Sequence, residues 1–236
     1  MKTMRKGKFI VFEGIDGSGK STQAKLLLKN IKKAGFKTAF IHFPQYGKKS
    51  AGLVEEYLSG KYGDASGVSP YSASIFYSCD RFDASFQIRS WLKQGRVVIS
   101  DRYIGSNVGH QGGKIKDKKE RKEYLQWLYN LEYNVFGIPK PDLTFILKVP
   151  ANIGKSLSEK LAKTLRRAAK VNYLGKKTDI HERDINHLTN TEKSYLQWIK
   201  EFPRDFKVIE CFQDQRLLSA KEISQKIWEI IKKNLK

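Results

Sequence analysis

A glycine-rich segment near the start of the chain constrains the fold more than any other feature. Residues 14–21 have the sequence GIDGSGKS, which fits the pattern G-x-x-x-x-G-K-[ST], and they follow the apolar run Phe9-Ile10-Val11-Phe12. The segment leads directly into residues 20–33, whose apolar spacing is that of a helix. A loop of this kind between a buried strand and a helix surrounds phosphate groups with backbone N–H groups and the positive end of the helix. It therefore predicts a nucleoside triphosphate site at the edge of a sheet.

The residue types within this segment favour contacts with magnesium-ATP. Glycines let the backbone approach the phosphates closely, and Lys20 is placed to reach the β- and γ-phosphates. The hydroxyl of Ser21 has the position from which such loops bind Mg²⁺. We therefore expect ATP as phosphoryl donor and Mg²⁺ as metal, with the phosphates in contact with Gly14, Asp16, Gly17, Ser18, Gly19, Lys20, Ser21 and Thr22.

Short apolar runs and helical periodicities alternate along the rest of the chain. Strands joined by helices predict an α/β fold, here a five-stranded parallel sheet with helices on both faces. The expected strands are residues 9–12, 38–43, 97–100, 143–149 and 207–211. The expected helices are residues 20–33, 53–58, 74–94, 125–136, 155–170 and a last helix that starts at Ser219.

The last helix has a clear start signal. Ser219 precedes Glu222 by three residues, which is the spacing of a capping box.

No internal repeat and no linker-like segment divides the chain. We therefore expect a single domain over residues 1–236.

The composition excludes several classes of protein. With 236 residues, of which 40% are hydrophobic, the chain can bury a core and is not of the disordered type. No apolar run approaches the roughly 20 residues that span a bilayer, so we expect no membrane partner. The basic start, Met1 to Lys8, precedes an apolar run too short for a signal peptide. These features favour a cytoplasmic protein, with Cys79 and Cys211 as reduced thiols in the core.

The chain carries a large excess of positive charge. Its 45 Lys and Arg residues against 24 Asp and Glu residues give a formal net charge of +21. Such a surface attracts anions, whether nucleotides or nucleic acids. Because the lysines are scattered rather than gathered in one block, we interpret them as a solvated basic surface and do not expect nucleic acid as a partner.

Two Asp-Arg pairs indicate a second substrate. Asp101-Arg102 directly follows the expected strand 97–100, at the edge where parallel sheets bind ligands. A carboxylate there suits a magnesium contact, and the planar guanidinium beside it suits a phosphate. Asp80-Arg81 lies on a helix rich in aromatic residues, and alone it would be weak evidence because such charges are usually solvated.

Taken together, these segments resemble the thymidylate kinase family. The resemblance covers nearly the whole chain in the right order, and the combination is far more specific than the glycine-rich loop alone. The matching segments are GIDGSGKST (14–22), FPQYG (43–47), YSCDR (77–81), DRY (101–103), SNVGHQG (106–112) and PDLT (141–144).

The resemblance implies a homodimeric enzyme that phosphorylates dTMP with magnesium-ATP in dTTP biosynthesis. It implies that Arg81 and Arg102 bind the dTMP phosphate, with Arg81 also near the base. Tyr77 would stack on thymine, and Asn107 and Gln111 would lie where base contacts are made. The substrate-binding residues implied in this way are Phe43, Pro44, Tyr46, Tyr77, Arg81, Arg102, Ser106, Asn107, His110 and Gln111.

The resemblance also implies a metal site and a lid. Asp101 would support magnesium together with Ser21, and Asp16 would contact the 3′-hydroxyl or help to position the acceptor. A lid that excludes water is expected at about residues 155–182. Because Ser18 stands where some family members carry an arginine, the lid would supply that charge. The expected catalytic residues are Lys20, Asp16, Arg102 and, from the lid, Arg166 or Arg167.

The chain departs from the family pattern at three acceptor positions. Tyr46 stands where an arginine is common, and Tyr77 replaces a phenylalanine, which preserves stacking. His110 replaces a common aromatic residue, so the choice between deoxyribose and ribose stays open.

Two alternative functions also stay open. One is a related kinase for another nucleotide or a deoxynucleoside, and the other is an ATPase of the same loop class that binds nucleic acid.

Overall fold

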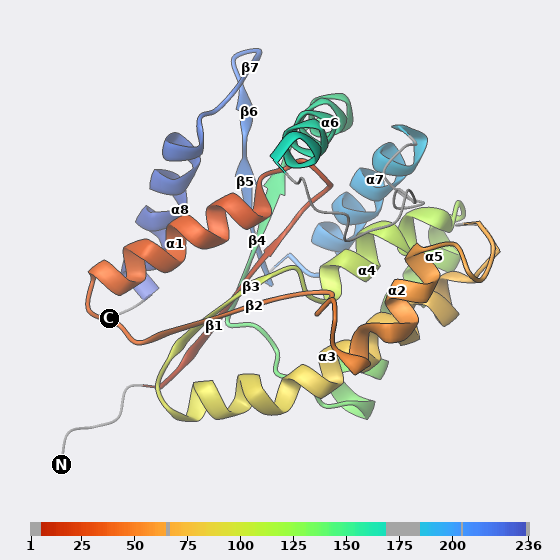
Figure 1. Cartoon of the computed structure of the whole chain (residues 1–236), viewed down its shortest axis with the longest axis horizontal. Helices are drawn as coiled ribbons and strands as arrows, with labels where there is room; N and C mark the ends of the chain where they lie inside the picture. Colours follow the sequence, from red (N-terminus) through yellow and green to blue (C-terminus); the bar gives the residue numbers. More distant parts are fainter. Residues whose placement is uncertain (1–5, 65–66, 169–184, 204, 235–236) are drawn as a thin grey trace.

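The structure, a computed structural model, describes residues 6–64, 67–168, 185–203 and 205–234. Within this part of the chain, one sheet has five parallel strands in the order β2-β3-β1-β4-β5 (Figure 1). The five-stranded parallel sheet predicted from the sequence is therefore confirmed. The strands are β1 (Lys8–Glu13), β2 (Thr38–His42), β3 (Val97–Asp101), β4 (Leu143–Lys148) and β5 (Phe206–Glu210).

Strand β1 lies at the centre of this sheet and sets where the glycine-rich loop emerges. It pairs with β3 on one side, where Phe12 is opposite Asp101, and with β4 on the other. Because all three strands are parallel, their carboxyl ends meet at one edge. The loop after β1 and the residues after β3 are thereby neighbours, as ligand sites in open α/β sheets require.

Helices cover both faces of the sheet (Figure 1). Helices α1 (Lys20–Lys33) and α8 (Ala220–Asn234) lie on one face. The other face carries the helices α3 (Pro70–Lys93), α4 (Ile104–His110), α5 (Lys118–Tyr129) and α7 (Ile185–Glu201).

The two faces follow from the alternation of side chains along β1. Phe9 and Val11 are buried in the core shared with the α3 side, whereas Ile10 and Phe12 are buried in the core shared with α1 and α8. Every residue of β3 is buried as well. Strands buried on both faces have continuous apolar sequences, which explains why they could be recognised without an alternating pattern.

The remaining elements are short or peripheral. They are the 3₁₀ turn η1 (Lys49–Ala51), α2 (Gly52–Leu58), the 3₁₀ turn η2 (Gly112–Lys114), the π-helix η3 (Asn130–Val135), α6 (Ala151–Ala168), and the hairpin of β6 (Phe212–Gln213) and β7 (Arg216–Leu217). No helix in the described ranges is both long and apolar enough to cross a membrane.

Two sequence predictions about helices are confirmed in detail. Helix α1 has the bounds expected from its periodicity. At the start of α8, the Ser219 hydroxyl accepts a hydrogen bond from the Glu222 N–H at 3.2 Å, and the Ser219 N–H donates to the Glu222 carboxylate at 2.8 Å. This reciprocal pair is the predicted capping box.

Other predictions were wrong. The segment 125–136 is not one regular helix, because α5 starts at Lys118 and changes into a π-helix at Asn130. Cys79 is exposed on α3 rather than in the core, whereas Cys211 is buried as expected.

Helices α4 and α7 were not predicted, and they pack together through glycines. A Cβ on Gly109 would lie 2.5 Å from the Tyr195 ring, and one on Gly105 would lie 2.7 Å from the Trp198 ring. These contacts require the absence of a side chain on α4. Because glycine disfavours helices in isolation, the close packing rather than local propensity accounts for α4.

The packing of α4 on α7 predicts the effect of adding one methyl group. We expect Gly109→Ala to lower the free energy of unfolding by about 1–3 kcal/mol, because the closely packed Tyr195 ring must shift. Gly52→Ala is the matched control, since its backbone is helical and an added Cβ meets no atom within 4 Å. Urea unfolding of both variants measures the difference, and equal stability of the two would contradict this packing.

Candidate active site

The glycine-rich loop after β1 has backbone conformations that its glycines permit. Gly14, Gly17 and Gly19 have φ values of 139°, 78° and 88°, in the region that favours glycine. A Cβ on Gly17 would lie 2.0 Å from the carbonyl oxygen of Gly154 in α6. The loop therefore packs directly against the first turn of α6, and a side chain at position 17 could not fit.

Lys20 lies inside this loop. Its side chain is only 5% exposed, and its ammonium group donates to the carbonyl oxygens of Gly14 at 2.9 Å and Ile15 at 2.8 Å. Burial and the nearby Arg102 lower the pKa of Lys20 to about 8. A partly desolvated ammonium held among the loop's backbone groups is suited to bind a phosphate anion.

Ser21 and Asp101 meet at the position predicted for magnesium. The Ser21 hydroxyl donates a short hydrogen bond to Oδ2 of Asp101. The other carboxylate oxygen, Oδ1, is buried and has no hydrogen-bond partner within the described ranges. A hydroxyl and a carboxylate are hard oxygen ligands, and Mg²⁺ is usually held by only one or two carboxylates together with phosphates and water. These two residues therefore fit Mg²⁺ bound together with ATP.

Asp16 and Arg102 form an ion pair across the loop. The Arg102 guanidinium donates a short hydrogen bond to Oδ1 of Asp16, and the Lys20 ammonium lies 3.8 Å from the same atom. Burial tends to raise the pKa of Asp16, but Arg102, His110 and Lys20 outweigh it and hold that pKa well below its ordinary value. Asp16 is therefore ionised, and it holds Arg102 at the mouth of the loop.

His110 lies on the other side of Asp16. Its Nε2 is 3.9 Å from the Asp16 carboxylate, and its Nδ1 is 3.1 Å from Nε2 of His187 on α7. The two imidazole rings are stacked, with centroids 5.4 Å apart. His187 comes beside His110 through the packing of α7, a helix that the sequence did not predict.

Glu13, at the end of β1, is a buried residue that sequence analysis missed. Its carboxylate accepts hydrogen bonds from the Tyr103 N–H at 2.6 Å, the Ser106 hydroxyl at 3.0 Å and the Tyr195 hydroxyl at 3.2 Å. Burial raises the pKa of Glu13 above its ordinary value. This carboxylate joins the end of β1 to the turn that carries Arg102, and so it fixes the two halves of the site relative to one another.

Every residue that the resemblance assigned to the acceptor lines a single pocket beside the loop. The pocket is lined by Asp16, Phe43, Pro44, Tyr46, Leu58, Tyr77, Arg81, Arg102, Tyr103, Ser106, Asn107, His110 and Gln111. Tyr46 is 56% exposed at the rim of this pocket, whereas Gln111 is 1% exposed and its Oε1 has no hydrogen-bond partner in the described residues. An unpaired amide oxygen at this wall is available to a ligand.

Two carboxylates behind the pocket hold its walls. Asp80 accepts from the Gln45 N–H at 2.8 Å and from the Ser50 hydroxyl at 2.7 Å, so it fixes the loop that carries Phe43 and Pro44. Glu132 accepts from the Arg81 guanidinium at 2.9 Å. The sequence predicted no role for either carboxylate, because the partner side chains of Asp80 and Glu132 lie 30 and 51 residues away along the chain.

The predicted lid lies only partly within the described residues. Arg166 and Arg167 belong to α6, but their side chains lie outside what the structure describes. The acidic segment 179–182, which was expected after the lid helix, also lies outside the described residues.

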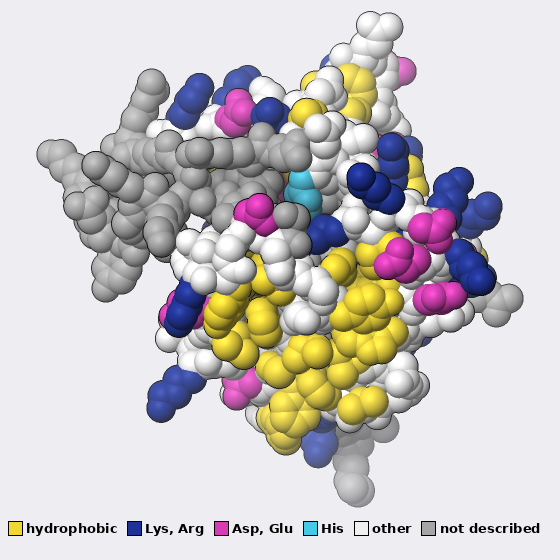
Figure 2. Space-filling model, turned by 90° about the vertical axis from the view of Figure 1, so that its right-hand side faces the viewer, with side chains coloured by type: hydrophobic (Ala, Val, Ile, Leu, Met, Phe, Trp, Pro, Cys, Tyr) yellow, Lys and Arg dark blue, Asp and Glu magenta, His cyan; other side chains and the backbone are white. Residues whose placement is uncertain are grey.

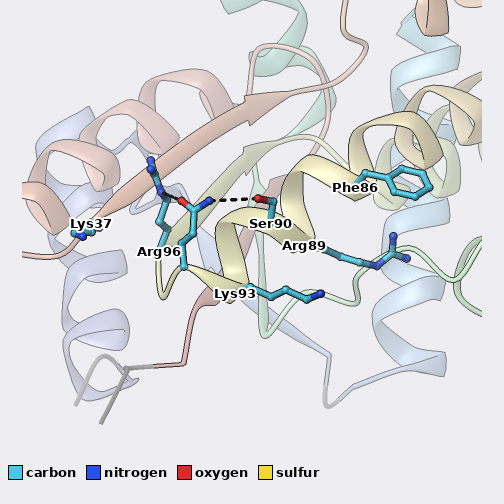
Figure 3. Close-up of a pocket in the computed structure, with 7 residues that line it drawn as sticks. Lys37, Phe86, Arg89, Ser90, Lys93 and Arg96 are labelled. Carbon is cyan, nitrogen blue, oxygen red and sulfur yellow. Dashed lines mark hydrogen bonds between the residues drawn. The ribbon is translucent and has the colours of Figure 1, made fainter. Parts of the chain in front are cut away.

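A larger recess lies at the opposite edge of the sheet (Figure 3). Its volume is about 650 Å³, and it is lined by Lys37, Phe86, Arg89, Ser90, Lys93, Gln94 and Arg96. Lys37 directly precedes β2 and Arg96 directly precedes β3, so these residues lie at the amino ends of the strands. The recess contains none of the predicted site residues and shows that part of the excess positive charge lies away from the site.

A loop for a nucleoside triphosphate that opens onto a pocket for a second molecule is the arrangement of a kinase. The acceptor pocket carries two arginines, Arg81 and Arg102, which suits an acceptor that itself bears a phosphate. The fold and the site thus define a P-loop kinase of the nucleoside monophosphate class.

Comparisons with known proteins identify the family. The family model described as "Thymidylate kinase" matches residues 12–227. The thymidylate kinase of Plasmodium falciparum is 33% identical over 155 residues, which cover 66% of this chain and 68% of that protein. The thymidylate kinase of Mycobacterium tuberculosis is 32% identical over 165 residues, which cover 70% and 76%. This chain belongs to the thymidylate kinase family, as the sequence motifs had indicated.

A solved structure supports the fold independently. Thymidylate kinase from Candida albicans matches with a TM-score of 0.70 and 24% identity, over 97% of this chain and 92% of that one. At this identity the match concerns the fold alone.

The phosphate loop predicts the effect of removing Lys20. We expect Lys20→Ala to lower kcat by at least about a thousandfold, because the transferred phosphoryl group loses its main cation in the loop. Lys25→Ala, on the exposed side of α1, is the control and should keep full activity. Steady-state kinetics and thermal melting of both variants measure this; near-full activity of a folded Lys20→Ala would show that the loop does not bind the donor.

Proposed function

We propose that the chain transfers the γ-phosphoryl group of magnesium-ATP to the phosphate of dTMP, which gives ADP and dTDP. The observation that carries this proposal is the adjacency of the glycine-rich loop and the acceptor pocket across the Asp16–Arg102 ion pair. The family of the chain supports the choice of dTMP as acceptor. In this account the reaction occurs where the two phosphates meet, at the mouth of the loop.

On the donor side, the loop N–H groups and Lys20 would bind the β- and γ-phosphates. The metal would be held by Ser21 and Asp101, whose oxygens already meet in the structure. When bound, Mg²⁺ would neutralise charge on the β- and γ-phosphates during transfer. The backbone of residues 14–22 and the ammonium of Lys20 would keep those phosphates in line with the acceptor.

On the acceptor side, Arg102 would bind the dTMP phosphate, and Asp16 would orient Arg102. Tyr77 would stack on the base, with Asn107 and Gln111 at its edge, since all three line the same pocket. The phosphate of dTMP is ionised at neutral pH and is already a nucleophile, so the reaction needs no strong general base. Catalysis would come from alignment and from neutralisation of charge.

We further propose that residues 1–236 form one kinase domain with a lid at about residues 155–182. Helix α6, which begins this region, packs against the glycine-rich loop at Gly154. An arginine of the lid, Arg166 or Arg167, would stabilise the charge on the transferred group and help to exclude water. A cytoplasmic location is also proposed, on the basis of the family alone.

A homodimer is proposed from an exposed apolar stripe on α3. Ile75, Phe82 and Phe86 are 42%, 41% and 62% exposed and are spaced by seven and four residues along one side of the helix. Hydrophobic side chains also gather on the lower half of the face shown in Figure 2.

We expect Phe86→Asp to convert the dimer to a monomer, because the substitution places a charge in the exposed apolar stripe. Light scattering after gel filtration measures the mass, and an unchanged mass would place the interface elsewhere.

The choice of substrate can be tested with a panel of acceptors. We expect ADP release from magnesium-ATP to be fastest with dTMP when it is compared with dUMP, dCMP, UMP, AMP and thymidine. Preference for another acceptor would support a related kinase. Activity with none of them, together with ATP hydrolysis stimulated by DNA or RNA, would contradict the kinase proposal.

The role of Arg102 predicts a specific kinetic change. We expect Arg102→Ala to raise KM for dTMP at least about tenfold, with a smaller effect on KM for ATP, because a buried phosphate loses its charge partner. Arg96→Ala, in the distant basic recess, is the control for loss of an arginine. An unchanged KM for dTMP in Arg102→Ala would count against this role.

A further inference from the structure

Lys114 joins two segments that each contribute side chains to the acceptor pocket. It is the last residue of the turn η2, and its ammonium group donates a hydrogen bond to the Tyr57 hydroxyl of α2 at 2.6 Å. Leu58 follows Tyr57 in α2 and lines the pocket, and Gln111, which directly precedes η2, lines it as well. The Lys114 N–H also donates to the Gln111 carbonyl at 3.1 Å. One residue therefore holds both segments, the first through its side chain and the second through its backbone.

Tyr57 also supports the ring that is proposed to stack on the base. Its side chain is 1% exposed, and its ring meets the ring of Tyr77 edge to face, with centroids 6.4 Å apart and 88° between the planes. Such a contact favours one mutual orientation of the two rings. Of the two tyrosines, only Tyr77 lines the pocket. A contact that fixes Tyr57 therefore reaches a ligand through Tyr77.

The turn η2 is the better anchored of the two segments. A Cβ on Gly113 would lie 3.0 Å from the carbonyl carbon of Asn190, so η2 packs closely on α7. The guanidinium of Arg121 donates to the Gly112 carbonyl at 3.1 Å. Helix α2, by contrast, has only seven residues, and a helix of this length depends on tertiary contacts for its position. The hydrogen bond from Lys114 therefore places α2 relative to η2.

The charge of Lys114 makes this contact dependent on pH. Burial lowers the pKa of Lys114 to about 8, and Asp64, in the loop after α2, opposes this effect. Tyr57 faces the ammonium from α2, and α7 presents Asn190, which does not titrate, beside η2. A hydrogen bond from an ammonium is stronger than one from a neutral amine. The contact therefore weakens as the pH rises through the pKa of Lys114.

We propose that Lys114 is a positioning residue for the acceptor. Its ammonium fixes Tyr57 and, through this residue, the ring of Tyr77 and the Leu58 side of the pocket. The pocket is thereby formed before the acceptor binds, which increases affinity because less ordering remains to be done on binding. This proposal rests on the proposed phosphorylation of dTMP and adds to it a residue that does not line the pocket.

Two substitutions of Lys114 test the proposal. Lys114→Met keeps a side chain of similar length without the donor, and Lys114→Arg keeps a charged donor that does not lose its proton. At about pH 7 we expect Lys114→Met to raise KM for dTMP about tenfold, the usual effect of losing a charged hydrogen bond. The values of kcat and of KM for ATP should stay near those of the wild type. Lys114→Arg should restore most of the affinity for dTMP.

The pH profile separates positioning from general stability. Between about pH 7 and about pH 9, on either side of the pKa of Lys114, we expect the wild-type KM for dTMP to rise toward the value of Lys114→Met. In Lys114→Arg the rise should be smaller. Lys20, whose pKa is also lowered to about 8, is present in all three enzymes, so its titration cancels in the comparison.

Two further variants serve as control and as second test. Lys116→Met removes an exposed lysine two residues away and should leave KM for dTMP and its pH profile unchanged. Tyr57→Phe removes only the hydroxyl that accepts from Lys114, and it should also raise KM for dTMP with kcat unchanged. If Lys114→Met is too unstable to assay, Tyr57→Phe decides.

The outcomes distinguish this proposal from the function on which it rests. A wild-type KM for dTMP in folded Lys114→Met or Tyr57→Phe would overturn the role of Lys114, even if the melting temperature fell, while the wild-type enzyme would still be a dTMP kinase. Absence of dTMP phosphorylation by the wild-type enzyme would instead overturn the proposed function, before any variant is compared.

Discussion

The parallel pairing of β1 with β3 is the constraint on which the site depends. It places Phe12 opposite Asp101, so the glycine-rich loop and the Asp101-Arg102 turn leave the sheet side by side. The Arg102 N–H continues this pairing by donating to the Phe12 carbonyl at 3.0 Å. The metal position and the Asp16–Arg102 pair both follow, since each joins a residue after β1 to one after β3.

Charge compensation then shapes the interior around this edge. Glu13 is satisfied by three donors, Arg81 by Glu132, and Arg102 by Asp16. Removal of one partner from a buried ion pair costs about 3–5 kcal/mol, comparable to the loss of a large core side chain. The arrangement is therefore rigid, and rigidity is what a reaction controlled by alignment needs. Arg102 has a φ of 70°, an unfavourable conformation for this residue, which these contacts must hold.

Local patterns in the sequence predicted much of this structure. The loop 14–21, the five strands and the capping box at Ser219 depend on neighbours in the chain, and their spacing alone was sufficient. The acceptor residues could be gathered only through the family resemblance, and the structure places them around one pocket.

The features that the sequence did not predict depend on contacts between distant segments. Helix α4 contains glycines that only its packing against α7 explains. Glu132 lies 51 residues from Arg81, and a π-helical turn that no periodicity indicates brings the two together. Glu13 continues an apolar strand, so nothing in its neighbourhood shows that Ser106 and Tyr195 come to meet it.

In the proposed reaction, donor and acceptor bind side by side, on the two sides of the Asp16–Arg102 pair. Calorimetric titration with adenosine and thymidine joined through a polyphosphate chain tests it most directly. We predict one site per chain, binding at least about a hundredfold tighter than either ATP or dTMP, and competition by each nucleotide, because linked ligands bind the second site at high effective concentration. Binding no tighter than that of ATP, or no competition by dTMP, would contradict the account.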